Sequence, residues 1–575
     1  MTKDYTEALL WYRKSAEQGN LRGENNLGRM YYYGWGVAKD AVEAVRWFRK
    51  SAEHGNSHAV NNLAVMYENG WGVAKDLVEA IAWYRKAAEQ GYTVAQVNLG
   101  YMYENGRGVA TDDVEAVRWY RKAADQGYAL AQNNLGWLYA NGLGVAKDDV
   151  EAVGWYRKAA EQGLPIAQGN LGSMYGKGQG VAKDETEATM WYRKSAEQGN
   201  AIAQNVMGMR YEKGAGVARD DVQAVDWYRK AAEQGNADAQ SSLGIMYANG
   251  LGVSKDEAEA VNWYRKAAEQ GIPEAETNLG LMYYNGTGIA KDDAEAVSWF
   301  QRAASQDFAN AESALGSMYA NGQGVTKDEA EAVKWYRKAA EQGNATAQSN
   351  LGIMYENGRG VARDPVEAAG WFRKAAEQGL PVAQNNLGTM YANGVGLTRD
   401  YPEAVSWYLK AAEEGYAAAQ RNVAALYWDG KGSAQDYEES IRWFRKAADQ
   451  GDPFAKNRLG DAYRIGQGVP QDFAKAIDWY CAAADSNYVD AMNKCGYGLL
   501  IGGPDVTPDL VEALKWLTLA VERSEPGEVQ QRATVNLNRA RAQATPEQVE
   551  EAERRAEELR AKWETRTDPT SSILQ

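Results

Sequence analysis

The chain has 575 residues, of which 45% are hydrophobic and 25% are charged, and it contains 20 tryptophans and 35 tyrosines. This composition excludes a disordered polymer, because so many apolar and aromatic side chains can form a large buried core. The formal net charge of −15 excludes nucleic acid and anionic membrane surfaces as favoured partners, since both are negatively charged.

The opening residues bear on localisation. The sequence MTKDYTEALLWYRK has charges where a signal peptide needs an apolar core. No run of about 18 apolar residues occurs in the chain, so no transmembrane helix is predicted. We therefore expect a cytoplasmic location for the chain as written, and no insertion into a membrane.

Tryptophan recurs at a fixed interval, beginning in the first predicted helix, residues 4–18. The interval is 36 residues thirteen times in succession and then 37 residues once. The positions are Trp11, Trp47, Trp83, Trp119, Trp155, Trp191, Trp227, Trp263, Trp299, Trp335, Trp371, Trp407, Trp443, Trp479 and Trp516. Such a period indicates stacked repeats, each a pair of helices. We call the first helix of each repeat the A helix and the second, which holds the tryptophan, the B helix.

Each B helix has marked ends. An Asp stands seven residues before each tryptophan, as Asp40 does before Trp47, and is predicted to cap the helix. A Glu such as Glu43 usually follows three residues later, which predicts an Asp form of the capping box. A Gly ends the helix in twelve repeats, and Asp307 or Asn487 replaces it in two. All fourteen sites therefore predict a residue in the left-handed conformation.

Each A helix has one apolar face, as Ala59, Leu63, Met66 and Tyr67 show by their helical spacing. Because neither helix can cover its apolar face within one pair, neighbouring pairs must stack on each other. A Gly occupies the middle of most A helices, as Gly100 does, where it weakens the helix. It predicts the close approach of a neighbouring helix, which we place under the large tryptophan.

The strings LGxMYxNGxGVxKD and EAVxWYRKAAEQG recur through residues 21–522 and resemble Sel1-like repeats of the tetratricopeptide superfamily. The resemblance implies an all-α fold, an α-solenoid of antiparallel helix pairs in a right-handed superhelix. It also implies a scaffold for protein–protein interaction. Together with the near-identical tandem copies, it indicates a bacterial origin.

The predicted organisation has four parts. Residues 1–20 are the orphan B helix of a truncated first repeat, so we expect the gene product to continue upstream; the alternative is that another molecule covers this end. Residues 21–522 form about fourteen tandem repeats. Residues 523–563 are expected to be capping helices, the last opening with the capping box Thr545–Gln548. Residues 564–575 are polar and are expected to be disordered.

Few residues suggest chemistry. His54 and His58 stand four residues apart around a helix break, so we interpret them as solvated side chains and not as metal ligands. Cys481 and Cys495 fall on a B helix and the next A helix, and we interpret them as two small buried thiols, although they could lie close together. The GxG strings follow a helix and not a strand, which disfavours a phosphate loop. The sequence predicts no enzyme, no metal site and no cofactor.

Candidate partner-binding residues lie where the repeats differ. The residue two positions after the core Leu of each A helix, here called the rung position, varies and points away from that Leu. The rung residues are Arg29, Val65, Tyr101, Trp137, Ser173, Met209, Ile245, Leu281, Ser317, Ile353 and Thr389. They either line a groove for a peptide or pack under the next A helix. The candidates are Tyr101, Trp137, Met209, Ile245, Leu281 and Ile353.

Trp35 and Trp71 are further candidates, because they occupy the first two GxG loops where later repeats have smaller or charged residues. They are either binding anchors or lids over their own helix pairs. The sequence as a whole predicts a non-enzymatic scaffold or adaptor that binds other proteins or peptides along the solenoid surface. The alternatives are a cell-wall-related hydrolase and the repeat portion of a larger signalling protein.

Overall fold

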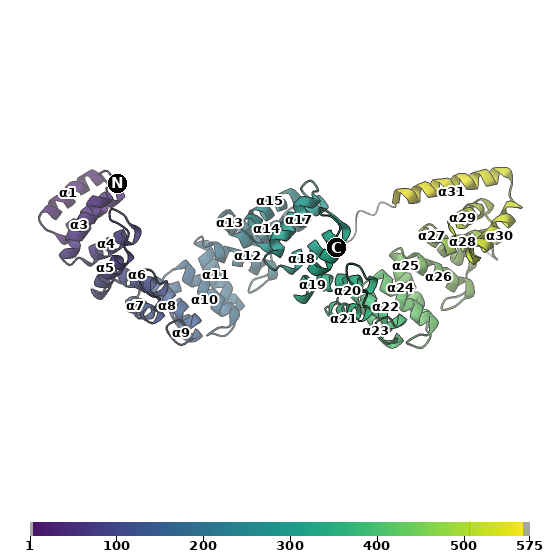
Figure 1. The fold of residues 1–575 in the computed structure, drawn as a ribbon, viewed down its shortest axis with the longest axis horizontal. Helices are drawn as coiled ribbons and strands as arrows, with labels where there is room; N and C mark the ends of the chain where they lie inside the picture. The colour runs from purple at the N-terminus through teal and green to yellow at the C-terminus, as the bar shows by residue number, and fades with distance from the viewer. Residues whose placement is uncertain (1–3, 505, 567–575) are drawn as a thin grey trace. The chain divides into compact units, whose positions relative to one another are not determined.

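The computed structural model describes residues 4–504 and 506–566. These residues form 31 helices and no β-strand, apart from an isolated bridge between Gly503 and Val506. They divide into two compact units, residues 1–291 and 292–575, in each of which consecutive helices pack side by side (Figure 1). The all-α fold of stacked helix pairs predicted from the sequence is confirmed. The segment 567–575, most of the tail expected to be disordered, lies outside the described residues.

The first unit holds sixteen helices. Its B helices are α1 (Tyr5–Glu17), α3 (Ala41–Glu53), α5 (Leu77–Glu89), α7 (Asp113–Asp125), α9 (Asp149–Glu161), α11 (Glu185–Glu197), α13 (Asp221–Glu233) and α15 (Glu257–Glu269). Its A helices are α2 (Leu21–Tyr33), α4 (Ser57–Asn69), α6 (Thr93–Glu104), α8 (Ala129–Asn141), α10 (Pro165–Lys177), α12 (Ala201–Lys213), α14 (Ala237–Asn249) and α16 (Pro273–Asn285).

The second unit holds the remaining helices. Its B helices are α17 (Asp293–Ala304), α19 (Glu329–Glu341), α21 (Pro365–Glu377), α23 (Tyr401–Glu413), α25 (Tyr437–Asp449), α27 (Phe473–Ala484) and α29 (Leu510–Arg523). Its A helices are α18 (Ala309–Asn321), α20 (Ala345–Asn357), α22 (Pro381–Asn393), α24 (Ala417–Asp429), α26 (Pro453–Ile465) and α28 (Val489–Ile501). Two further helices follow, α30 (Glu528–Arg541) and α31 (Pro546–Arg566).

The Asp caps of the B helices are confirmed, but the predicted capping box is wrong. Asp40 Oδ1 accepts from the backbone N–H groups of Val42 and Glu43, each at 3.0 Å. The backbone N–H of Asp40 is already occupied, because it donates to the carbonyl of Tyr31 in the preceding A helix at 2.9 Å. The Glu three residues after the cap has another partner in several repeats, the Nε1–H of the tryptophan four residues further on, as at Glu115.

The left-handed ends of the B helices are confirmed. The twelve predicted glycines have positive φ, and so do the two substitutes, Asp307 at 58° and Asn487 at 62°. The glycine in the middle of most A helices also meets a neighbouring helix, but the residue it meets is not the tryptophan. A Cβ on Gly100 would lie 2.7 Å from the ring of Tyr120, the residue after Trp119. That tyrosine is fully buried, so the A helix must approach it closely.

The second glycine of each GxG loop serves a contact between repeats. Gly72 has φ +70°, and a Cβ there would lie 2.1 Å from the carbonyl oxygen of Ala41 at the start of α3. The loop therefore packs directly on the first turn of the preceding B helix. This contact accounts for the recurrence of the GxG string without any phosphate.

A hydrogen bond between arginine and tyrosine joins most B helices to the next A helix, and the sequence reading missed it. Arg49 Nη2 in α3 donates to Tyr67 OH in α4 at 2.8 Å, and this is one of eleven equivalent bonds among the described residues. The sequence pattern that could have revealed this bond is an Arg two residues after the tryptophan and a Tyr eighteen residues after that Arg. The bond ties each helix pair to its neighbour in the stack.

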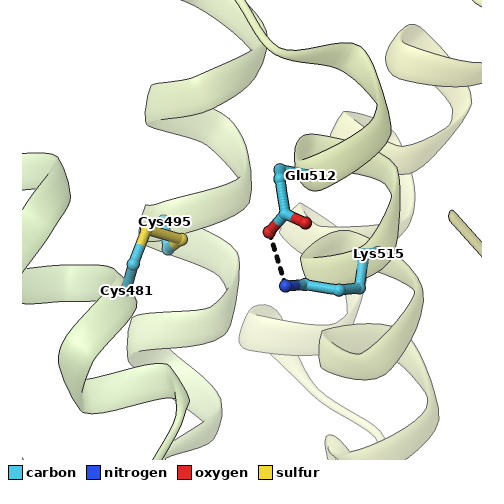
Figure 2. Close-up of a disulfide and its surroundings, with 4 residues drawn as sticks. All are labelled: Cys481, Cys495, Glu512 and Lys515. Atoms are coloured by element: carbon cyan, nitrogen blue, oxygen red, sulfur yellow. Dashed lines mark ion pairs between the residues drawn. A yellow bond between two sulfur atoms is a disulfide. The ribbon is translucent and has the colours of Figure 1, made fainter. Parts of the chain in front are cut away.

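The two cysteines form a disulfide between α27 and α28, so their interpretation as free thiols is wrong (Figure 2). Cys481 occupies the position of the arginine just described, and Leu499 occupies that of its tyrosine. A covalent link therefore joins these two helices where the hydrogen bond is missing. Beyond them, Trp563 of α31 is 5% exposed, and its Nε1 donates to the carbonyl of Asp485 at 2.9 Å.

Candidate partner-binding surface

The rung positions are exposed to different extents in the first unit. Tyr101, Trp137 and Met209 are 44%, 41% and 38% exposed, although all three are large apolar residues. Ile245 and Leu281 are half-buried. Other side chains of the A helices fill the core beside the rungs. In the helix that carries Tyr101, for example, Leu99 and Met102 are fully buried.

The rungs of the second unit are more covered. Ile353 is half-buried and packs against the core of its unit. Ser317 is 4% exposed and accepts a hydrogen bond from Tyr336 OH at 3.0 Å. Thr389 accepts from Tyr408 OH, also at 3.0 Å. At Ser317 and Thr389 the rung residue contacts a tyrosine of the following B helix, whereas the packing alternative derived from the sequence had placed the rungs under the next A helix.

The two loop tryptophans differ in their surroundings. Trp35 is half-buried and stacks on Tyr33 at 4.4 Å and on Tyr5 at 5.5 Å between ring centroids. It also packs against a buried cluster from α1 and α2, made up of Leu9, Ala16, Leu27 and Met30. Trp35 therefore covers α2 of its own repeat together with α1, the B helix of the preceding repeat. Trp71 is 42% exposed, and its one ring contact among the described residues is with Tyr32, at 5.6 Å.

Loop residues and rung residues adjoin, so the two candidate sets belong to one surface. The guanidinium of Arg29, a rung residue, lies 5.9 Å from the ring of Trp35. The guanidinium of Arg107, a loop residue, lies 5.7 Å from the ring of Tyr101. A cleft of about 200 Å³ at the N-terminal end of this surface is lined by Arg29, Tyr33 and Val65, among others.

Charges on this surface are mostly compensated. Glu68 Oε1 pairs with Arg107 at 2.8 Å, and its Oε2 accepts from Tyr84 OH at 2.6 Å. Burial, and then the bond to Glu68, raises the pKa of Tyr84 far above its usual range, so this phenol stays a proton donor. Arg29 is exposed and has no carboxylate partner in the described part of the chain.

Asparagines beside the rungs connect successive A helices, a feature that the sequence reading did not single out. Asn62 Nδ2 donates to Asn25 Oδ1 at 2.9 Å, and Asn98 Nδ2 donates to Asn61 Oδ1 at 3.2 Å. Two such short side chains can meet only if the helices are close neighbours, so these bonds fix the spacing of the rungs.

The two histidines have structural contacts. His54 Nδ1 lies 3.2 Å from Glu24 Oε2, and the His58 ring lies 4.5 Å from that of Tyr92.

Within residues 4–504 and 506–566, no group of three or more His, Cys, Asp or Glu residues is arranged to hold a metal ion. Among the described helices, none is long and apolar enough to cross a bilayer.

The comparisons with known proteins agree with this architecture. The family described as Sel1 repeat matches residues 1–20 and fourteen consecutive segments of 36 residues, from 21–56 to 489–524. A protective antigen present in uropathogenic Escherichia coli strains, whose crystal structure displays an SLR fold, is 36% identical. That match covers 86% of this chain and 98% of the antigen, with a TM-score of 0.63.

A second solved structure, a Sel1 repeat protein from Oxalobacter formigenes, is also 36% identical. It covers 54% of this chain and 89% of its own, with a TM-score of 0.44. The comparison with curated proteins gives no match. With Sel1 repeats matched along residues 1–524 and the same stacked helix pairs observed in the structure, the chain belongs to the Sel1 repeat family.

Proposed function

We propose that this protein is a non-enzymatic scaffold that holds a partner protein on the surface formed by the rung positions and the adjoining loops. The observation that carries the proposal is the exposure of Tyr101, Trp137 and Met209, each at about two fifths, on three A helices of one unit. Large apolar side chains that are exposed on one face mark interaction sites more often than isolated ones do.

The fold does not require large side chains at these positions. Ser173 occupies the rung position of α10, and the core leucine of that helix, Leu171, is as fully buried as Leu135 in α8. A serine therefore supports the same packing as a tryptophan. The stack therefore does not require a ring at this position, and the 41% of Trp137 that is exposed is available for contact with another protein.

Sel1 repeat solenoids are typical of protein-interaction scaffolds, and the candidate chemistry in this chain is occupied by structural contacts. His54 pairs with Glu24, and the capping Asp residues accept backbone N–H groups. These contacts support a binding role over the hydrolase alternative, because they leave no paired nucleophile and base among the residues considered.

The test compares two triple variants of the full chain. The first replaces the exposed rungs, Tyr101→Ser, Trp137→Ser and Met209→Ser. The matched control replaces three valines at the starts of B helices, Val42→Ser, Val114→Ser and Val150→Ser, which are 65%, 65% and 67% exposed. Both sets remove exposed apolar side chains, so both should leave helix content and melting nearly unchanged.

We expect the rung variant to lose the proteins that the wild-type chain captures from a lysate of its source, while the control variant keeps them. Equal capture by the wild-type chain and the rung variant would contradict the proposal. Loss of capture by both variants would also contradict it, because the effect would then not depend on this surface. A broad screen for hydrolase activity on the same samples tests the enzymatic alternative.

A further inference from the structure

The link between α27 and α28 differs from the link between most successive helices. Elsewhere an Arg–Tyr hydrogen bond joins the two helices, as Arg445 and Tyr463 do between α25 and α26, and the A helix contributes a core Leu. Between α27 and α28 both features are absent. Cys481 and Leu499 occupy the positions of the hydrogen bond, and Cys495 occupies that of the core Leu. The disulfide therefore replaces the usual contacts and does not simply add to them.

Breaking the disulfide leaves a weak interface between these two helices. Cys495 is fully buried, and its side chain is smaller than the leucine that other repeats have at this position. A smaller side chain fills less of the core and stabilises it less. The side chains of Cys481 and Leu499 cannot form the Arg–Tyr bond either. With the cross-link reduced, α27 and α28 thus lack both features that hold most neighbouring helices together.

The same interface anchors the last helix, α31. Trp563 is 5% exposed and belongs to the buried cluster that also contains Cys495 and Ala484. Its Nε1 donates to the carbonyl of Asp485, the residue that ends α27, at 2.9 Å. Trp563 is the one large side chain that is buried among the described residues of α31. The anchor of α31 therefore sits on the junction of the two helices that the disulfide joins.

The ion pairs of α31 lie at the surface. Arg555 Nη1 lies 2.8 Å from Oε1 of Glu512, which is carried by α29 beside the disulfide-bonded helices (Figure 2). Arg560 Nε lies 3.1 Å from Oε2 of Glu522, also in α29. All four side chains are partly exposed, and ion pairs at such positions contribute little net stability. The docking of α31 thus depends on Trp563 and on the geometry of α27 and α28.

The disulfide can be reached from one side. Cys481 is half-buried, whereas Cys495 is fully buried. A thiolate of a dithiol reductant attacks Sγ of Cys481, the S–S bond breaks, and Cys495 leaves as a thiolate that takes up a proton. The second thiolate of the reductant then attacks the mixed disulfide and releases Cys481, which is protonated in turn. Two electrons and two protons pass to the protein, and the reductant leaves as its own disulfide.

We propose that the Cys481–Cys495 disulfide is a redox switch for the C-terminal end of the stack. With the bond formed, α31 stays docked on α27 and α29; with the bond reduced, α31 is released. Disulfides persist in oxidising compartments and are reduced by dithiols in the cytosol, so the two states correspond to these two environments. The switch is independent of the proposed function, because the exposed rungs that carry that function lie in the first unit.

The experiment measures hydrogen exchange of the full-length protein in its oxidised form and after treatment with dithiothreitol. The chain has two cysteines, so alkylation of an aliquot shows by mass whether both thiols have been freed. The matched variant combines Cys481→Arg, Cys495→Leu and Leu499→Tyr. It has no thiol, and it restores the residues that most repeats use at these positions.

Reduction should lower the exchange protection of the α31 amides about tenfold or more, and reoxidation should restore it. Protection in α2–α16 should change by less than about twofold, because a repeat protein opens locally. The matched variant should keep α31 protected both with and without dithiothreitol. In the oxidised protein, Trp563→Ala should release α31 while the disulfide remains intact.

Four results would overturn the inference. The first is unchanged protection of α31 after both thiols have been freed, and the second is an equal loss of protection throughout α17–α31, which would mean that the whole unit opens. The third is release of α31 from the matched variant by dithiothreitol, and the fourth is full protection of α31 in Trp563→Ala. If the matched variant fails to fold, reduction and reoxidation of the wild-type protein still decide the question.

Discussion

The pair Arg210 and Thr189 allows the energetics of the stack to be tested at one interface between a B helix and an A helix. Most repeats have Met at the position of Arg210 and Val at that of Thr189, as Met246 and Val225 show. Arg210 is 8% exposed, and its Nε donates to Thr189 Oγ1 at 2.5 Å. Its Nη2 donates to the carbonyl and to Oε2 of Glu185, each at 2.7 Å. The polar pair thus replaces an apolar contact.

The magnitudes follow from which group loses its partner. Thr189→Val alone leaves a buried charged donor unsatisfied, so it should destabilise this part of the stack by about 1–3 kcal/mol. The double variant Thr189→Val with Arg210→Met restores the side chains that neighbouring repeats use. It should be neutral or more stable than the wild type by up to about 1–4 kcal/mol, because a buried ionic contact is replaced by apolar packing.

The assay is native-state hydrogen exchange of the amides in α11 and α12, because a repeat protein opens locally and a global melting curve would average over all repeats. Arg210→Met completes a double-mutant cycle. The cycle should give a coupling energy of about 1–3 kcal/mol between the two sites. Additive effects, within about 0.5 kcal/mol, would refute the claim that the two substitutions compensate each other.

Three further predictions concern other parts of the molecule. Gly72→Ala should destabilise more than Gly55→Ala in equilibrium unfolding, because both have positive φ but a Cβ meets a carbonyl oxygen only at Gly72; equal losses would contradict the loop contact. Reducing Cys481–Cys495 should lower protection from hydrogen exchange at the C-terminal end by up to about 3 kcal/mol, with no change in the first unit. Two neighbouring arginines lower the pKa of Glu551 from 4.5 to about 2, so its ionised form contributes stability above pH 4.5 that is lost as the pH falls towards 2. Exchange in α31 should therefore rise over that range, and less so in Glu551→Gln.

The sequence by itself determined the features that depend on neighbouring backbone atoms. An Asp before a helix accepts N–H groups two and three residues away, and a Gly after it adopts positive φ, so both can be recognised from local spacing. Asp307 and Asn487 were identified for the same reason. The period of 36 residues then required stacking, because no single pair can bury its own apolar face.

Only the tertiary structure decided contacts between side chains distant along the chain. Glu43 was assigned to a capping box because local spacing permits one, but the N–H in question is bonded to Tyr31 of the preceding helix. The ring facing Gly100 is that of Tyr120 and not Trp119, since the rotation of one helix against the other decides which neighbouring ring faces inward. The disulfide between Cys481 and Cys495 could not be predicted from their spacing, because it depends on how close two helices lie.

Identifying the candidate site required both the sequence and the tertiary structure. Repeat-to-repeat variation was sufficient to identify the rung positions, because a position that the stack does not constrain is free to vary. The exposure of each rung was not predictable, since it depends on which neighbouring side chains cover it: Trp137 is 41% exposed, whereas Ser317, at the equivalent position, is 4% exposed and bonded to Tyr336. Sequence spacing thus places a side chain on a face of its own helix, while the packing of the neighbouring helices decides whether that face meets solvent.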